Sequence, residues 1–147
     1  MARRETRGTA PRHGSFPTTA DVGIWARAPT PSGLFEGLGQ ALYGVMTDLR
    51  RVRPVATRTV SASGSDLAGL VVAFLTELLL LEQDDGFVGR RLAARTVGDP
   101  PTAVRATVSG ETIDAARHVR RKEVKAITFH RLEVDLDPPR ARVILDI

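Results

Sequence analysis

The segment from residue 123 to 147 alternates between apolar and polar residues, and two adjacent prolines interrupt it. The apolar positions are Val124, Ile127, Phe129, Leu132 and Val134 before the prolines, and Ala141, Val143, Leu145 and Ile147 after them. Alternation of this kind is typical of strands with one buried and one solvent-facing side. Pro138 and Pro139 lack a backbone N–H and fix φ, so the chain has to turn there. The pattern predicts two strands joined by a turn, and any fold of this chain therefore has to include a half-buried sheet.

Asp146 stands between Leu145 and Ile147, so strand alternation places its side chain on the opposite face of the sheet. Its carboxylate then lies close to the terminal carboxylate of Ile147. Anionic oxygens at such short range repel one another unless a cation lies between them, and a hard divalent metal is the usual partner. A solvated chain end without a metal is the competing interpretation, since exposed aspartates and unstructured termini are common.

Two helices are predicted in the first half of the chain. The first is amphipathic and runs from a cap at Ser32 to about Asp48; its glycines weaken it, so it depends on packing. The second runs from Leu67 to about Glu82, is apolar nearly all round and is too short to span a bilayer, so we expect a central core helix. Strands are expected at 15–28, 56–63, 87–97 and 103–108.

The composition bounds the class of protein. A chain of 147 residues is one domain's worth, and its 42% hydrophobic and 26% charged residues are ordinary for a globular protein. It has no cysteine, which excludes disulfides and thiolate chemistry. Residues 1–14 hold four arginines and one glutamate, and we expect a disordered basic arm there. Because this arm lacks the apolar core of a secretory signal, we expect a cytoplasmic protein.

Histidines and basic runs give weaker indications. His130 lies in the predicted strand beside Phe129, and the sequence is compatible both with a structural histidine and with a catalytic base there. The densest basic segment is 115–125, which is either a solvated surface or a contact for phosphates. Phosphate-binding loops, dinucleotide fingerprints and nucleophile elbows are absent from the sequence, so enzymes of those classes are not expected.

Ordered short motifs from Phe16 to Ile147 resemble the archease family. They are Thr19-Ala20-Asp21-Val22-Gly23-Ile24, Leu34-Phe35-Glu36, Met46-Thr47-Asp48-Leu49, Asp66-Leu67 with Phe74-Leu75 and Glu77-Leu78-Leu79, Gly110-Glu111, Val124-Lys125-Ala126-Ile127-Thr128-Phe129-His130 and Val143-Ile144-Leu145-Asp146-Ile147. The resemblance implies a single α+β domain over residues 15–147, in which two main helices pack against a largely antiparallel sheet.

The resemblance also implies a function. Such a protein is expected to activate an RtcB-type RNA ligase, promoting its GTP-dependent guanylylation and turnover in tRNA splicing and RNA repair, without being an enzyme itself. Carried over by motif, Asp21 and Asp146 are the expected ligands of a divalent metal (calcium, magnesium or manganese). The ligase is the expected partner, with RNA contacted only indirectly or weakly and no membrane.

The residues extend this expectation. If the strand at Asp21 lies beside the last strand, the two carboxylates converge and Ile147 adds its terminal carboxylate as a further ligand. The expected partner-binding residues are Lys125, Arg121 and His130. The alternative is that they form only a solvent-exposed strand edge with no partner. One position departs from the family pattern: Thr18 stands where a histidine is usual, and a hydroxyl is a poorer metal ligand than an imidazole.

Two other functions compete with the activator. The first is a basic RNA-binding or chaperone-like module that uses the arm and the segment 117–125. The second is a metal-dependent hydrolase, for which His130 is the only candidate general base near the expected site.

Overall fold

The computed structural model describes residues 10–147. In this range no helix is long and apolar enough to cross a membrane. Residues 1–9 of the expected basic arm lie outside the described residues. The rest of that arm is not disordered, because the first strand, β1 (Arg12–Pro17), starts within it. The expected strand at 15–28 covers only the end of β1 and is divided by a turn at 18–21, after which β2 begins; the start of β1 was missed because Phe16 is its one large apolar residue besides Pro17.

The first sheet has the order β1-β2-β8-β6, and β7 also pairs with β8. Its strands are antiparallel. Their bounds are β1 (Arg12–Pro17), β2 (Val22–Arg27), β6 (Ala126–Ile127), β7 (Glu133–Leu136) and β8 (Pro139–Asp146). Strand β2, from the N-terminal part of the chain, and β8, from its C-terminal part, are therefore neighbours in one sheet and pair along the whole length of β2.

The second sheet has the order β3-β5-β4 and is also antiparallel. Its strands are β3 (Ala56–Ser63), β4 (Phe87–Gly98) and β5 (Pro101–Thr112). A bulge interrupts the β4–β5 ladder between Gly89 and Arg91. A short 3₁₀ helix, η1 (Leu49–Arg51), leads into this sheet.

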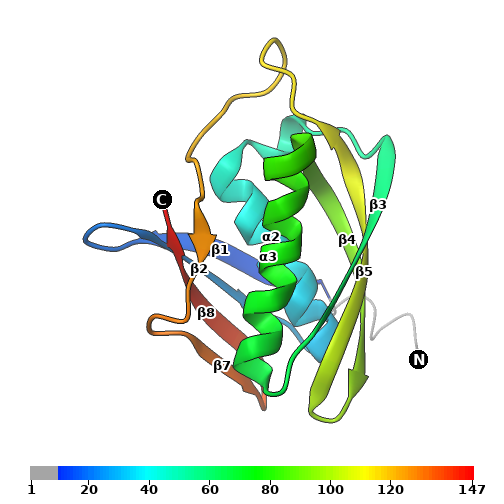
Figure 1. The fold of residues 1–147 in the computed structure, drawn as a ribbon, viewed down its shortest axis with the longest axis vertical. Helices are drawn as coiled ribbons and strands as arrows, with labels where there is room; N and C mark the ends of the chain where they lie inside the picture. Colours follow the sequence, from blue (N-terminus) through cyan, green and yellow to red (C-terminus); the bar gives the residue numbers. More distant parts are fainter. Residues whose placement is uncertain (1–9) are drawn as a thin grey trace.

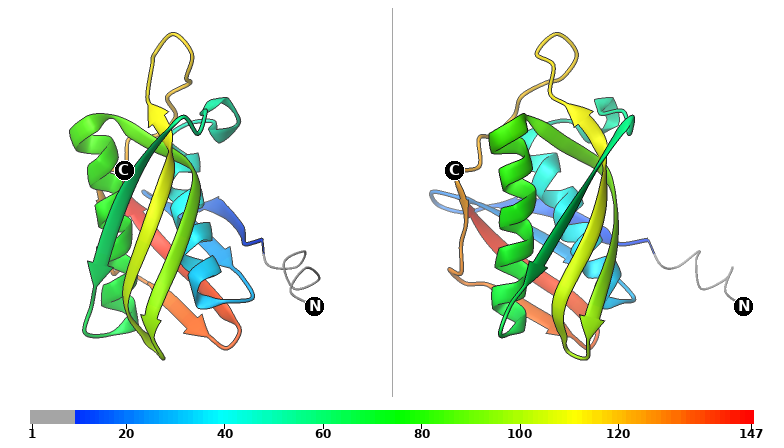
Figure 2. Two further views of the ribbon diagram at one scale, coloured as in Figure 1. Left: turned by 90° about the vertical axis from the view of Figure 1, so that its right-hand side faces the viewer. Right: turned by 45° about the vertical axis from the view of Figure 1, so that its right-hand side comes forward.

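Two helices, α2 (Pro31–Met46) and α3 (Leu67–Asp85), lie between the two sheets (Figures 1 and 2). Helix α2 packs against β4 on one side and against β1 and β2 on the other, and α3 packs against β3 and β5 and against β6 and β7. Helix α3 buries one side, with Leu70, Val71, Phe74, Leu75, Leu78 and Leu79, and leaves Glu77 and Leu80 exposed on the other. The sequence prediction of a core helix is confirmed for the buried side of α3, but α2 has more buried residues and is the more central of the two helices.

The caps of the helices follow from short polar side chains. Asp66 caps α3 as expected, since its carboxylate accepts a hydrogen bond from the backbone N–H of Gly69 at 2.7 Å. Helix α2 is capped by Thr30 rather than Ser32, with Pro31 in the first turn. Proline suits that position because its missing N–H would have no partner there.

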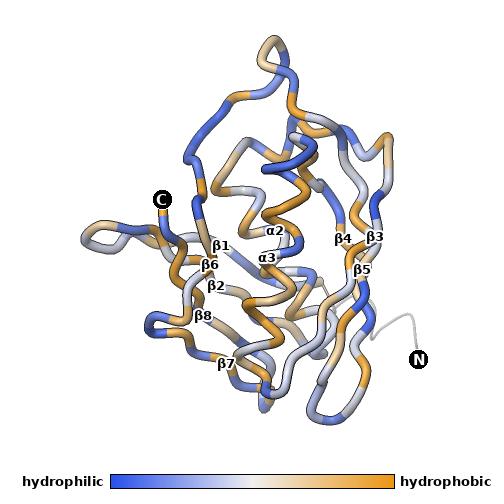
Figure 3. The backbone as a smooth tube through the Cα atoms, in the orientation of Figure 1, coloured by the Kyte–Doolittle hydropathy of each residue, from blue (hydrophilic) through white to orange (hydrophobic). Residues whose placement is uncertain are grey.

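The core lies where both helices meet both sheets. Phe35 and Phe74 make an edge-to-face contact across the helix pair, with ring centroids 5.3 Å apart. The hydroxyl of Tyr43 donates a hydrogen bond to the carbonyl of Leu78 at 2.7 Å, so a polar group joins the helices inside the core. The loop between β5 and β6 projects beyond this core and is largely hydrophilic (Figure 3).

The C-terminal segment differs from the sequence prediction in one respect. The expected strand at 124–134 is divided into β6 and β7 by a turn at 128–132, in which Arg131 has a φ of 53°. Apolar residues continue through this turn, so the alternation alone did not reveal the break. The expected fold class, a single α+β domain with two main helices and antiparallel sheet, is confirmed.

Candidate functional site

The pairing of β2 with β8 brings Asp21 next to Asp146. Val22 is opposite Leu145 in the last pair of this ladder, so the register, continued by one residue, places Asp21 opposite Asp146. Residues directly opposite in an antiparallel pair have Cβ atoms about 5 Å apart. The convergence expected of these two aspartates is therefore what the strand register produces, although the full length of the domain separates them in sequence.

Strand alternation also places both carboxylates on the same face. Val22 and Leu145 point into the core, with 8% and 0% exposure, and their neighbours Asp21 and Asp146 point to the opposite side of the sheet. Asp146 is exposed and Asp21 is half-buried. Among residues 10–147 neither aspartate forms an ion pair with a cationic side chain. Their repulsion is therefore not offset within this part of the chain.

The donor set fits a hard divalent cation. Carboxylate oxygens are the ligands that Ca²⁺, Mg²⁺ and Mn²⁺ prefer. Ile147, half-buried against the core, adds the terminal carboxylate beside Asp146. No group of three or more His, Cys, Asp or Glu side chains in the described range is placed to hold a metal. A metal held here would therefore have only the two aspartates and the chain terminus as protein ligands, with water or a partner in its other positions.

The β1–β2 turn is closed by Thr18. Its backbone N–H donates to the carbonyl of Asp21 at 3.3 Å, and its hydroxyl accepts a hydrogen bond from the backbone N–H of Asp21 at 3.1 Å. The residue that departs from the family pattern thus stabilises the turn that presents Asp21.

One of the expected partner-binding residues, Lys125, lies beside this acidic end. The backbone N–H of Lys125 donates to the carbonyl of Asp146 at 2.7 Å, and the Lys125 side chain is exposed. His130 lies in the turn at 128–132 and not in a strand, which corrects the sequence prediction. Its backbone N–H donates to the Thr128 hydroxyl, but within the described chain its imidazole has no hydrogen-bond partner to orient it. Phe129 beside it is 61% exposed.

Arg121 is placed elsewhere. Its guanidinium donates to the carbonyl of Gly44 at 3.2 Å and lies 4.0 Å from the carboxylate of Asp48, at the C-terminal end of α2. The backbone of the same segment is also attached to α2, because the N–H of Arg121 donates to the carbonyl of Met46 at 2.8 Å. Arg121 therefore holds the β5–β6 loop against the helix.

Glu111 organises the rest of that loop. Its buried carboxylate accepts hydrogen bonds from Arg117 at 2.6 Å and from the backbone N–H of Arg53 at 2.7 Å. The ring of His118, which is 4% exposed, completes the cluster: its Nδ1 accepts from the backbone N–H of Asp114, so Nε2 carries the proton and donates to Glu111 at 3.0 Å.

This cluster was not foreseen as a unit. Gly110-Glu111 was noted only as a family dipeptide, and Arg117 and His118 only as part of a basic segment. A glutamate at the end of an apolar alternation, followed closely by arginine and histidine, was the one available signal. The cluster shows that part of the 117–125 segment serves the structure and is not a free basic surface.

The fold and its acidic end define a class of small α+β domain, in which two helices lie between two antiparallel sheets and carboxylates meet at one exposed sheet end. The chain matches the Archease protein family (MTH1598/TM1083) over residues 14–147. It therefore belongs to the archease family.

Relatives named protein archease include chains from several organisms. Protein archease of Methanothermobacter thermautotrophicus is 35% identical over 136 residues, covering 90% of this chain and 96% of the relative. Protein archease of Thermococcus gammatolerans is 34% identical, covering 82% and 85%, and that of the fish Ictalurus punctatus is 32% identical, covering 88% and 81%.

Solved structures agree with the fold. The solution structure of Methanobacterium thermoautotrophicum protein 1598 superposes with a TM-score of 0.74 at 31% identity, covering 92% of this chain and 98% of that one. The crystal structure described as an archease and possible chaperone from Thermotoga maritima superposes with a TM-score of 0.54 at 16% identity, covering 90% and 94%, and shows the shared fold alone.

Proposed function

We propose that this protein activates an RtcB-type RNA ligase, promoting its guanylylation by GTP and its repeated turnover in tRNA splicing and RNA repair. The observation that carries the proposal is the juxtaposition of Asp21 and Asp146 at an exposed sheet end, in a chain that belongs to the archease family. The protein acts as a cofactor of the ligase, and the chemistry belongs to the ligase.

The acidic end is suited to a shared divalent ion. Asp21, Asp146 and the terminal carboxylate of Ile147 would hold calcium, magnesium or manganese, and the ion would supply positive charge for phosphate oxygens. Few protein ligands leave coordination positions that water occupies and that a partner or nucleotide phosphate can displace. The chain's own part is to hold the two carboxylates at a fixed spacing, which the β2–β8 ladder does.

The surroundings of the site suit a docking partner. Phe129 is a large apolar side chain with 61% of its surface exposed, and Lys125 and His130, near it in sequence, are exposed as well. Aromatic anchors bordered by charged residues are typical of the energetic centre of protein interfaces. Lys125 and His130 would contact phosphate or an acidic surface of the ligase. Arg121 is less suited to this role, because its guanidinium already contacts the carbonyl of Gly44 and the carboxylate of Asp48.

A metal-dependent hydrolase is the less favoured alternative. It needs a general base that a neighbouring group orients, and the His130 ring has no such neighbour among residues 10–147. For the activator, the chain is proposed to act in the cytoplasm, with the ligase as its macromolecular partner.

A guanylylation assay tests the proposal. The cognate ligase is incubated with GTP and Mn²⁺ and covalent guanylate is measured with time, without this protein, with it, and with its Asp146→Asn variant. Wild-type protein is expected to raise the rate, and the variant to lose at least about tenfold of that effect, the loss typical when a charged group at a functional site is removed.

The matched control is Asp99→Asn, which removes an exposed aspartate in the turn between β4 and β5, on the second sheet. It is expected to stimulate as well as wild type. Failure of the intact protein to stimulate its cognate ligase would reject the activator function.

A further inference from the structure

On the face of the first sheet that points away from the helices, two aromatic rings lie over glycines of the neighbouring strands. Phe16 in β1 is opposite Gly23 in β2, and Trp25 in β2 is opposite Gly14 in β1. A Cβ at Gly23 would meet the Phe16 ring at 2.1 Å, and one at Gly14 would meet Trp25 at 2.8 Å. Each ring therefore lies over a glycine of the neighbouring strand, both are half-buried, and side chains at these two positions would displace them.

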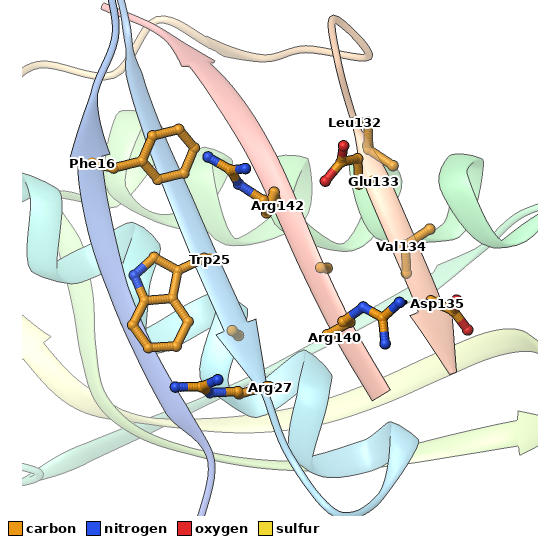
Figure 4. Close-up of a pocket in the computed structure, with 11 residues that line it drawn as sticks. Phe16, Trp25, Arg27, Leu132, Glu133, Val134, Asp135, Arg140 and Arg142 are labelled. Carbon is orange, nitrogen blue, oxygen red and sulfur yellow. Dashed lines mark hydrogen bonds and ion pairs between the residues drawn. The ribbon is translucent and has the colours of Figure 1, made fainter. Parts of the chain in front are cut away.

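Arginines lie beside the rings on the same face (Figure 4). The guanidinium of Arg142 is 4.4 Å from the centroid of Phe16, and that of Arg27 is 5.3 Å from the centroid of Trp25. The strand register adds Arg12 and Arg140 to the row of Arg27. Within the described residues Arg27 and Arg142 form no ion pair, so their charges are available to a ligand.

These side chains line a hollow with a cavity volume of about 800 Å³. Two carboxylates on β7, Glu133 and Asp135, form its far border, and Asp135 lies 3.4 Å from Arg140. Positive charge is therefore unopposed on the β1–β2 side of the face and partly neutralised on the β7 side.

We propose that this face binds single-stranded RNA, with bases stacking on Phe16 and Trp25 and phosphates contacting Arg27 and Arg142. Half-exposed rings on a sheet flanked by arginines combine the two elements of sequence-tolerant single-strand binding, which are stacking and electrostatic attraction. Glu133 and Asp135 repel phosphates, so the backbone of the strand runs along the β1–β2 side. An acidic protein segment would share the attraction to arginine but gains no base stacking.

The site lies on the same sheet face as Asp21 and Asp146, but it does not depend on the metal or on ligase activation. Binding is therefore tested with the protein alone and with a chelator present, so that failure of the RNA site and failure of the proposed function are distinguishable.

Trp25 is the only tryptophan in the chain and reports on binding directly. Protein is titrated with an oligouridylate of about ten nucleotides, within the range of single-strand site sizes, and quenching of Trp25 fluorescence is compared with anisotropy of the labelled strand. We expect saturable quenching, the same midpoint by both signals, and affinity that falls as salt rises. Arg142→Gln and Arg27→Gln are each expected to weaken binding by about fivefold or more, and Glu133→Gln to strengthen it.

Arg58→Gln is the matched control, because Arg58 also stacks on a ring, that of Phe87 at 4.6 Å, but on the second sheet. It is expected to leave RNA affinity unchanged. The proposal is overturned if the oligouridylate does not quench Trp25 fluorescence, or if Arg58→Gln weakens binding as much as Arg142→Gln does. It is also overturned if uridine monophosphate quenches at the same concentrations as the strand, or if polyglutamate quenches and the RNA does not. Urea denaturation of each variant confirms that the fold is retained.

Discussion

Glu111 shows how one buried carboxylate can secure a long loop. Burial favours its neutral form, but hydrogen bonds from Arg117, from the backbone N–H of Arg53 and from His118 outweigh burial and lower the pKa of Glu111 to about 2. The same contacts join β5 to the segment before β3 and to the start of the β5–β6 loop. A single ionised side chain therefore fixes three parts of the chain.

This lowered pKa predicts how stability depends on pH. Because the folded-state pKa of Glu111 lies below its ordinary value of 4.5, its contribution is fully present above about pH 4.5 and is lost as the pH falls toward 2. Glu111→Gln is expected to lower the free energy of unfolding by about 2 kcal/mol at neutral pH and to flatten its decline in acid. Urea denaturation at a series of pH values measures both effects.

Glu123→Gln is the control for that experiment, since Glu123 is exposed in the same loop. It is expected to keep the stability and the pH profile of wild type. An unchanged acid decline in Glu111→Gln would show that other carboxylates are responsible.

Helix α2 depends on glycines that serve different purposes. Gly37 faces the first sheet, where an added Cβ would lie 2.9 Å from the Cβ of Pro11 and 3.1 Å from that of Ala26. At Gly44 an added Cβ would meet only Leu49, at 4.0 Å. The sequence prediction that packing rather than propensity stabilises this helix agrees with the close approach at Gly37.

Two alanine substitutions in α2 are expected to have opposite effects. Gly44→Ala should raise the free energy of unfolding by about 1 kcal/mol, because alanine has the higher helix propensity and there is space for its methyl group. Gly37→Ala should lower the free energy of unfolding by about 1 kcal/mol or more, because Pro11 and Ala26 have short side chains that cannot rotate away from the added methyl group. Chemical denaturation followed by circular dichroism measures both. Equal stabilisation by the two alanines would contradict the close contact of α2 with the first sheet.

The whole molecule brings the two ends of the described chain together in one sheet. The β1–β2 hairpin precedes both helices and β8 ends the chain, yet β2 and β8 pair along their length. Both sheets pack on the same two helices, so the helix pair fixes where the first sheet forms. The acidic end is therefore a property of the complete fold.

Substitution of both aspartates should show their coupling. With a chelator present, Asp21→Asn and Asp146→Asn are each expected to raise the free energy of unfolding by about 0.5 kcal/mol, since like charges directly opposite destabilise a sheet. With Ca²⁺ or Mn²⁺ at about a hundred times its dissociation constant, wild type should gain about 2.7 kcal/mol and the variants should lose most of this gain. Thermal denaturation with and without the ion measures the effect.

The double variant should lose little more of the metal-dependent gain than either single variant, because both aspartates serve one ion. Asp99→Asn, in the exposed turn between β4 and β5, is expected to respond to the metal as wild type does. An equal metal response in all variants would place any ion elsewhere.

Much of the local structure could be predicted from the sequence. The strand at 56–63 and the core helix from Leu67 agree with the structure, and so do the buried faces of β2 and β8. The prediction failed in two places. The start of β1 was not predicted because β1 has few apolar residues, and the turn at 128–132 was not predicted because apolar residues continue through it. Asp21 and Asp146 were named by family resemblance, whereas the Glu111 cluster and the stacked rings were not recognised.

For β2, β3, β8 and the two helices, the period of the apolar residues was sufficient to decide the type of element, because these preferences act between near neighbours in the chain. The order of the strands, the meeting of Asp21 with Asp146 and the placement of Phe16 and Trp25 over glycines were decided only in the folded state. They depend on which distant segments pair and in what register, and that choice is made by the packing of both sheets on one pair of helices.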